Sequence, residues 1–312
     1  MPINYIDRSR LKRFSNLELV ARQVVEGFIT GMHKSPFHGF SVEFAEHRQY
    51  NQGESTRHID WKLYGRTDRL YVKRYEEETN LRCQILVDVS SSMYYPVKEN
   101  PGPDDPNKMV FSVYAAAAII QMLLKQRDAA GLSLFSDHIQ QHTRARSTQA
   151  HLQYLYGNLE RHLQQPKPDE KHATAVSTVL HNIAERIPKR SLVVIFSDMF
   201  DSYEDTGKIF SALQHLKHNK HEVILFHTIE KSTEFDFVFE NRPYKFIDME
   251  GGNELKLNPR EIRSQYLQRI GSFRKQLKLR CGQYKIDYVE ADISKGFEQV
   301  LLPYFRKRKK MF

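Results

Sequence analysis

The sequence predicts an α/β fold in which a mostly parallel, Rossmann-type sheet is flanked by helices. Short β-branched apolar runs alternate with helix-length amphipathic segments from residue 82 onward, which is typical of parallel strands joined by crossover helices. Breaks rich in Pro, Gly and Asp, such as residues 96–106 and 166–168, separate them. The chain has 312 residues, 40% of them hydrophobic and 12% aromatic, which is enough for a substantial core.

Five apolar runs are the predicted strands: Gln84–Val87, Gly131–Phe135, Leu192–Phe196, Val223–Phe226 and Lys285–Val289. Apolar residues at three- and four-residue spacing predict the helices between and after them. These are Lys108–Gln126, which is Ala-rich and therefore expected to be buried, Gln149–Leu163, Val176–Arg186, Thr206–His218 and Arg260–Leu279. Two short strands joined around Asn241–Pro243 predict an antiparallel hairpin insertion near residues 235–250.

The first ~75 residues differ from the rest, and their length is marginal for an independent core. Leu17–Phe28 has a helical pattern, and the remainder is rich in Arg, His and aromatic residues. We therefore expect residues 1–79 to form an appended N-terminal layer docked on a main domain of residues 80–305. Residues 306–312 are expected to be a basic tail.

The positive charge of the chain is confined to its C-terminal part. Lys and Arg total 47 against 38 Asp and Glu, but residues 1–259 carry 33 of each. The surplus lies in residues 260–312, with 14 basic and 5 acidic residues, including the run Arg306–Lys310. Terminal charge runs are usually solvated, so nucleic-acid binding through this end is only an alternative and is not favoured.

Three features favour a cytoplasmic location. The longest nearly apolar stretch, Val113–Leu124, is short of the ~20 residues that a membrane span requires. The segment Met1–Phe14 lacks the apolar region of a signal peptide. Cys83 and Cys281 are far apart and lack metal-type spacing, so we expect reduced thiols.

Oxygen-bearing side chains follow two of the predicted strands. Gln84–Val87 leads into a D-x-S-x-S sequence, formed by Asp88, Ser90 and Ser92, and Leu192–Phe196 leads into Ser197 and Asp198. Because ligands bind at the carboxyl ends of parallel strands, these side chains are expected to converge there. Carboxylate and hydroxyl oxygens suit a hard divalent ion, so the sequence predicts a Mg²⁺ site, with Mn²⁺ possible.

This pattern resembles the metal-ion-dependent adhesion site of von Willebrand factor A domains, and the predicted fold is similar to theirs. The resemblance implies that Asp88, Ser90 and Ser92 form the first metal-binding loop, that Asp198 forms the Asp loop and that Thr174 supplies a third.

The assignment of the third loop leaves alternatives open. The Gly that usually stands two residues before the Thr is replaced by His172, so Ser177 or Thr178 remain candidates. Thr174 also fits the N-cap of the next helix.

Residues upstream of the D-x-S-x-S sequence resemble the bacterial domain of unknown function 58 family over roughly residues 15–200. The matching positions are Gly39, Glu43–Phe44, Arg48, Tyr50, Gly53–Glu54, Arg57, Ile59–Asp60–Trp61, Arg66 and the stretch Leu70–Glu78. Longer members carry membrane helices before this region. The resemblance implies an association with MoxR-type AAA+ ATPases and no established enzymatic activity.

Six of these positions have two interpretations: Arg48, Tyr50, Arg57, Asp60, Trp61 and Arg66. They are either a binding surface or a network of Arg and Asp side chains in which the sole Trp anchors the N-terminal layer. The second interpretation is favoured, because a large amphipathic ring is a typical anchor.

The chemistry of the predicted site favours binding over catalysis. Two carboxylates leave a divalent ion with an open coordination position, which suits an acidic residue of a partner. A hydrolytic two-metal site needs more carboxylates nearby. We therefore expect a non-enzymatic, Mg-dependent protein-interaction module, with a MoxR-type AAA+ ATPase or its client as the partner that the resemblance implies. A metal-dependent phosphoester hydrolase using the same loop is the alternative.

His215, His218 and His221 follow one another at three-residue spacing. Such spacing is compatible with zinc, but these residues fall at a predicted helix end and its loop, where histidines are usually solvated. We therefore do not expect a zinc site.

Overall fold

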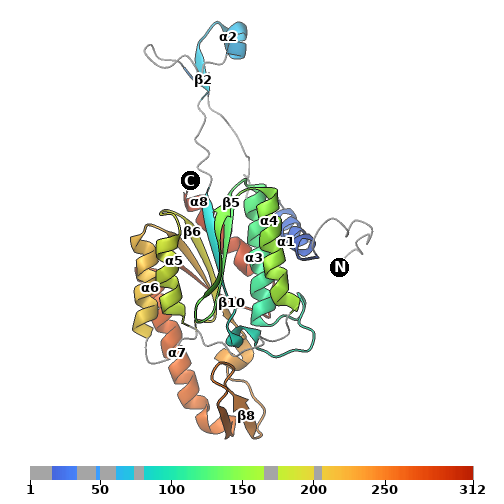
Figure 1. The fold of residues 1–312 in the computed structure, drawn as a ribbon, viewed down its shortest axis with the longest axis vertical. Coiled ribbons are helices and arrows are strands. Elements are labelled where there is room, and N and C mark those ends of the chain that lie inside the picture. Colours follow the sequence, from blue (N-terminus) through green and yellow to red (C-terminus); the bar gives the residue numbers. More distant parts are fainter. Residues whose placement is uncertain are drawn as a thin grey trace. The chain divides into compact units, whose positions relative to one another are not determined.

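The computed structural model describes residues 16–33, 47–49, 61–73, 81–164, 175–199 and 206–311 (Figure 1). The chain divides into two compact units. One comprises residues 1–28 and 81–312, and the other comprises residues 29–80. The predicted docking of residues 1–79 as a layer on the main domain stays a prediction.

The main unit is built on a six-stranded sheet in the order β10-β7-β6-β3-β4-β5, which confirms the predicted fold class. The strands are β3 (Arg82–Asp88), β4 (Ala129–Phe135), β5 (Ile139–Arg146), β6 (Leu192–Ser197), β7 (Glu222–Ile229) and β10 (Asp287–Asp292). Neighbouring strands are parallel except for the antiparallel pair β4–β5. The arrangement is consistent with a Rossmann-like or von Willebrand factor A-like fold.

Helices cover both faces of this sheet, so its central strands are largely apolar. Figure 1 shows α5 (Val176–Arg186), α6 (Thr206–His218) and α7 (Pro259–Gln283) on one side. On the other side are α3 (Lys108–Lys125) and α4 (Gln149–Gln164), and α8 (Glu298–Met311) packs beside α3 and β10. The rings of Phe196 and Phe226 stack between neighbouring strands with centroids 4.9 Å apart.

Helix α3 is the central helix of its layer. It begins at the cap residue Asn107, whose side chain accepts a hydrogen bond from Val110 N at 2.8 Å. Among the described residues it is the one helix long and apolar enough to cross a membrane, but 83% of that window is buried inside the protein. Its apolar character is therefore explained by the core that it fills.

Helix α1 (Asn16–His33) joins the main unit through its first part. Leu17, Ala21 and Val25 are buried, at the spacing of one helical face. Leu17 N donates to Glu160 of α4 at 3.0 Å, and the ring of Phe28 stacks on Phe305 of α8 at 5.2 Å. The predicted helix over residues 17–28 is therefore present and packs on the α/β body.

The second unit contains β1 (His47–Gln49), α2 (Trp61–Thr67) and β2 (Tyr71–Lys73). β1 and β2 pair in antiparallel register, with His47 opposite Lys73.

The hairpin insertion exists, but its position differs from the prediction. Its strands are β8 (Tyr244–Ile247) and β9 (Glu254–Leu257), with the turn at residues 248–253 and not at 241–243. Gly252 adopts φ 75° and donates its N–H to Asp248 O at 2.9 Å, so the glycine supplies the turn conformation. Of the residues expected to form the first strand, Phe235 ends the π-helical turn η5 (Lys231–Phe235), and residues 236–240 are not in a strand.

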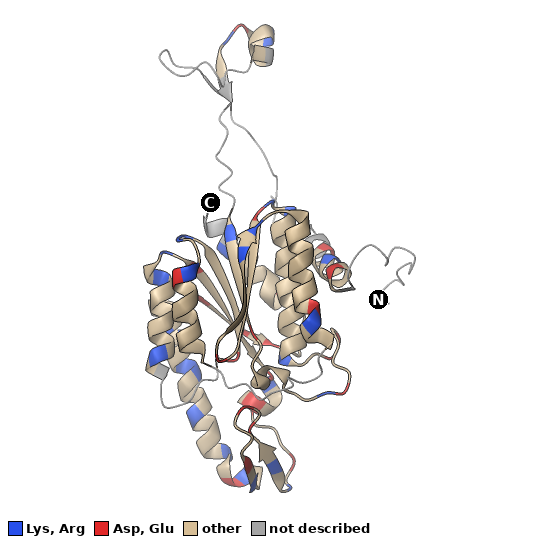
Figure 2. Ribbon diagram, in the orientation of Figure 1, with Lys and Arg blue, Asp and Glu red and all other residues tan. Residues whose placement is uncertain are grey.

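The predicted basic tail is wrong for residues 306–311, because they continue helix α8. Lys307 Nζ lies 2.5 Å from Glu222 Oε2 and 3.0 Å from Asp287 Oδ2, at the starts of β7 and β10. Burial disfavours the ammonium, but the two carboxylates outweigh it and raise the pKa of Lys307. The surplus of Lys and Arg is thus divided between α8 and the length of α7 (Figure 2).

Replacing Lys307 by Ala is expected to lower the free energy of unfolding by about 1 kcal/mol at neutral pH, since Asp287 loses this cation while the partly exposed Glu222 keeps its pairing with Lys217. Arg306→Ala is the matched control, because Arg306 belongs to the same basic run but is exposed. That control is expected to stay within about 0.5 kcal/mol of the parent in urea unfolding. Equal effects in the two variants would contradict an anchoring role for Lys307.

Candidate functional site

The predicted ligands lie at the carboxyl edge of the central sheet. β3 ends at Asp88, and the neighbouring β6 ends at Ser197 and is followed by Asp198. The two strands are parallel with Val87 opposite Phe196, so both acidic residues leave the sheet at the same edge.

Asp88 is fully buried and is held by the loop that it begins. Its Oδ1 accepts from Ser90 N at 3.0 Å, and its Oδ2 accepts from the Ser197 hydroxyl at 2.7 Å. Burial and the charge of Asp198 raise the pKa of Asp88 to about 7, against the opposing effect of these hydrogen bonds. A cation beside the Asp88 carboxylate would offset the free-energy cost of burying its ionised form.

Ser90 and Ser92 present their hydroxyls side by side. The two Oγ atoms are 3.1 Å apart, because Ser91–Tyr94 form a short 3₁₀ turn, η3, directly after Ser90. Neighbouring oxygens around Mg²⁺, each at about 2.1 Å from the ion, are about 3.0 Å apart in octahedral geometry. The spacing of the hydroxyl pair therefore fits adjacent ligand positions. Ser90 is buried and Ser92 is partly exposed, so Ser92 lies on the accessible side of the loop.

Asp198 is also fully buried, and its side chain contacts a buried lysine. Lys108 Nζ donates to Asp198 Oδ2 at 2.8 Å and to Glu234 Oε1 at 2.6 Å. Burial alone would lower the pKa of Lys108, but the two carboxylates raise it, so the ammonium stays charged.

His227 fixes the backbone of Asp198 from β7. Burial lowers the pKa of His227 to about 4, so the imidazole is neutral at physiological pH. Its Nε2 lies 2.8 Å from Asp198 O, an acceptor, and its Nδ1 lies 2.8 Å from the Tyr288 hydroxyl. The neutral ring therefore carries its proton on Nε2 and accepts from Tyr288.

The third predicted loop is only partly described. Thr174 lies outside the described residues, but Ala175 N donates to Ser136 O at 3.3 Å, just beyond the end of β4. The chain next to Thr174 thus lies at the carboxyl edge too. Ser177 is buried in the first turn of α5, and Thr178 is exposed.

The residues present fit a hard divalent cation. The buried carboxylates of Asp88 and Asp198 lie at the same edge as the hydroxyl pair, and in the described residues these two carboxylates and the partly buried one of Glu234 are accompanied by the ammonium of Lys108. A further positive charge would stabilise this group of carboxylates. Clusters of three or more His, Cys, Asp or Glu side chains in metal-binding geometry do not occur in the described part of the chain.

The three spaced histidines do not converge. His221 Nδ1 accepts from Ser191 N at 3.2 Å, whereas His218 is exposed at the end of α6. His215 instead faces His181 of α5, with their Nδ1 atoms 2.9 Å apart.

The upstream motif positions fall partly outside the described residues, namely Tyr50, Arg57 and Asp60. Arg48 lies in β1, and Trp61 and Arg66 lie in α2. Trp61 is 62% exposed, and its ring meets Tyr64 of the same helix edge-on at 6.2 Å. Both interpretations of this set stay predictions.

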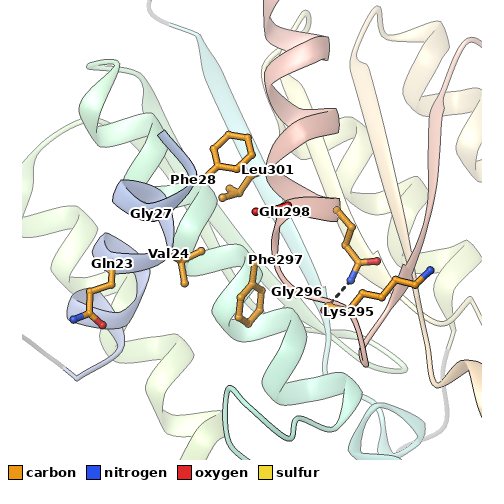
Figure 3. A pocket seen from close by; sticks show the side chains of 10 residues that line it. Gln23, Val24, Gly27, Phe28, Lys295, Gly296, Phe297, Glu298 and Leu301 are labelled. Carbon is orange, nitrogen blue, oxygen red and sulfur yellow. Dashed lines mark hydrogen bonds between the residues drawn. The ribbon is translucent and has the colours of Figure 1, made fainter. Parts of the chain in front are cut away.

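A cavity of about 520 Å³ lies elsewhere, between α1 and the start of α8 (Figure 3). Its wall is mainly apolar and includes Val24, Phe28, Phe297 and Leu301. None of the predicted ligands that belong to the described residues lines it.

Sequence reasoning missed several residues of the site, namely Lys108, His227 and Glu234. A signal exists for two of them: Lys108 is a charge at the start of a largely apolar helix, and His227 interrupts a largely apolar strand. Buried polar residues in such positions require partners. Glu234 has no comparable signal, because it lies in a polar segment after β7.

Solved structures of two other bacterial proteins are similar to this chain. BatB of Bacteroides thetaiotaomicron has a TM-score of 0.43 at 15% identity and covers 74% of this chain and 98% of its own. An aerotolerance-related membrane protein of Bacteroides fragilis has a TM-score of 0.44 at 14% identity and covers 73% and 99%.

Sequence relatives include the uncharacterized protein Rv1480 of Mycobacterium tuberculosis and the uncharacterized protein Mb1516 of Mycobacterium bovis. Both are 31% identical over 103 residues, which is 33% of this chain and 31% of each relative. The chain therefore matches less than a third of the length of these relatives. The model of a family described as "Protein of unknown function DUF58" matches residues 46–276, which is most of the chain. The chain belongs to the DUF58 family.

Proposed function

We propose that this protein is a cation-dependent protein-interaction module. Asp88, Ser90, Ser92 and Asp198 would hold Mg²⁺ or Mn²⁺, with Thr174 as the ligand from the third loop. The bound ion would supply a Lewis-acidic position that a carboxylate of a partner completes. The observation that carries this proposal is the meeting of two buried carboxylates with two hydroxyls 3.1 Å apart.

The distribution of carboxylates favours capture over hydrolysis. Two-metal hydrolysis requires several carboxylates that are available to bridge or bind both ions. Here the carboxylate of Glu234 is paired with Lys108, as is that of Asp198, and Asp88 and Asp198 would serve a single ion. Ser92 is the partly exposed ligand, so the open coordination position would face the partner from that side.

The partner that we propose is a MoxR-type AAA+ ATPase, or a client of one, acting in the cytoplasm. Support for this choice comes from the family alone, whereas the acidic character of the docking residue follows from the hard cation. The module would then act as an adaptor in the ATPase system.

Isothermal titration with Mg²⁺ and Mn²⁺ tests the metal assignment. The parent protein is expected to bind one ion, and Asp88→Ala is expected to lose this binding. Asp105→Ala is the control, because Asp105 is an exposed acidic residue paired with Lys98 in the loop after η3. Unchanged metal affinity in Asp88→Ala would overturn the assignment.

A pull-down tests the partner. Immobilised protein is expected to retain a MoxR-type ATPase from the same organism in Mg²⁺ and to release it in chelator. Asp88→Ala should retain none under either condition. Retention that is indifferent to both chelator and substitution would contradict metal-mediated capture.

A further inference from the structure

Lys108 joins the proposed metal site to the insertion that follows β7. It is the first residue of α3 and is fully buried, an expensive position for a charged side chain. Its ammonium lies between Asp198, which follows β6, and Glu234, which lies in η5. The ammonium of Lys108 therefore pairs with carboxylates on two segments that are far apart in the sequence.

Glu234 in turn holds the backbone at the start of the insertion. Its Oε1 accepts from Lys108, and its Oε2 accepts from Glu230 N at 2.8 Å, immediately after β7. The Tyr266 hydroxyl of α7 donates to Glu234 O at 2.7 Å. A change in the Lys108–Glu234 ion pair therefore acts directly on the backbone of residues 230–234.

A second bridge links the same segment to the loop of Ser90 and Ser92. The Tyr95 hydroxyl lies 2.6 Å from Thr233 Oγ1, and Tyr95 N donates to Ser92 O at 3.1 Å. Lys108 N also donates to Tyr95 O at 3.0 Å. The insertion is thus connected to both described metal loops. Figure 1 shows the β8–β9 hairpin beyond the carboxyl ends of the parallel strands, where these loops lie.

We propose that Lys108 couples cation binding at Asp88, Ser90, Ser92 and Asp198 to the stability of residues 230–238. This inference rests on the proposed function and assigns a regulatory role to the insertion. A cation bound by Asp198 repels the ammonium that contacts the same carboxylate. The interaction of Lys108 with Glu234 then strengthens at the expense of that with Asp198, and residues 230–238 become more firmly held.

Coupling between two sites is reciprocal. If metal binding strengthens the Lys108–Glu234 pair, that pair must in turn favour metal binding. Without the Glu234 carboxylate, the Lys108 ammonium interacts with Asp198 alone. It then repels a cation that binds at Asp198 more strongly. The metal affinity of the protein therefore depends on a residue that is not a ligand.

Hydrogen exchange and titration with Mg²⁺ alone test the coupling. In the parent, Mg²⁺ is expected to slow exchange of the amides of Glu230, Glu234, Asp236 and Val238 by about tenfold. Glu234→Gln keeps the size of the side chain and removes its charge, and is expected to weaken Mg²⁺ binding about fivefold or more and to abolish the slowing. Tyr95→Phe, which removes the second bridge, is expected to reduce the slowing.

Asp236→Asn is the matched control, because Asp236 is an exposed acid of the same segment that pairs with Lys231 at 2.9 Å. It should behave as the parent in both measurements. If Glu234→Gln binds Mg²⁺ as tightly as the parent and shows the same slowing, the coupling is wrong while the metal site stands. If the parent binds no Mg²⁺, the proposed function and the coupling both fail.

Discussion

Replacing Lys108 by Met is expected to lower the free energy of unfolding by about 3–5 kcal/mol, the cost of removing one partner from a buried ion pair. The substitution leaves two carboxylates, of Asp198 and Glu234, without the ammonium that lies 2.8 and 2.6 Å from them. Met fills a similar volume, so the loss is mainly electrostatic. Burial raises the pKa of Glu234, and its protonation relieves part of the cost, so the loss is expected to be larger at alkaline than at acidic pH.

Urea unfolding of the metal-free protein measures this effect. Lys231→Met is the matched control, since Lys231 pairs with Asp236 at 2.9 Å on the surface of the same region. Exposed pairs contribute about 0–1 kcal/mol, so the control is expected to unfold near the parent. If both variants lose the same small amount, the buried position of Lys108 has no energetic consequence and the electrostatic account of the site is wrong.

Stabilisation by Mg²⁺ is expected to depend on pH through Asp88. Its pKa in the folded, metal-free protein is about 7, above the ordinary value of 3.8. Between these two values the folded state holds a proton that the unfolded chain has lost, so the free energy of unfolding falls as the pH rises and levels off above about pH 7. Mg²⁺ competes with this proton, and its stabilising effect therefore grows over the same range.

Thermal unfolding with and without saturating Mg²⁺ measures this dependence. We expect an upward shift of roughly 5 °C at about pH 8 and a much smaller shift at about pH 5.5. Asp88→Asn is expected to show no shift at either pH. At the higher pH, the metal-free variant is expected to unfold at a higher temperature than the metal-free parent, since it buries no ionised carboxyl at this position. A Mg²⁺ shift that is independent of pH would exclude Asp88 as the ligand that exchanges a proton for the ion.

The regular elements whose apolar residues form a continuous run or stripe were predictable. Leu192–Phe196, Val176–Arg186 and Thr206–His218 were expected at or within one residue of their observed bounds. Each of them buries an apolar face in the central core, so its periodicity reflects its environment.

Strand β5 and helix α8 were not predicted. β5 is an edge strand that pairs only with β4, so its sequence Ile139–Arg146 is largely polar. In α8, Pro303 and the basic run obscure a buried face that includes Val300, Leu301, Tyr304 and Phe305. Neighbouring elements, and not local pattern, make these two segments regular.

The candidate site, like the regular elements, was predictable only where the local sequence determines the structure. The sequence by itself determined that Asp88, Ser90 and Ser92 follow a strand in one loop and that Asp198 follows another, because a parallel sheet brings strand ends to one edge. The spacing of the two hydroxyls depends on the local turn at Ser91–Tyr94.

Only the tertiary structure decided what surrounds these candidate ligands. Lys108 lies 90 residues from Asp198 and 126 from Glu234 in the sequence, and His227 reaches the Asp198 carbonyl from another strand. A local sequence pattern does not reveal such partners. A buried charge or imidazole requires a polar partner, and the fold determines which polar group lies beside it. The candidate ligands could therefore be recognised in the sequence, whereas the charged groups around them were determined by packing.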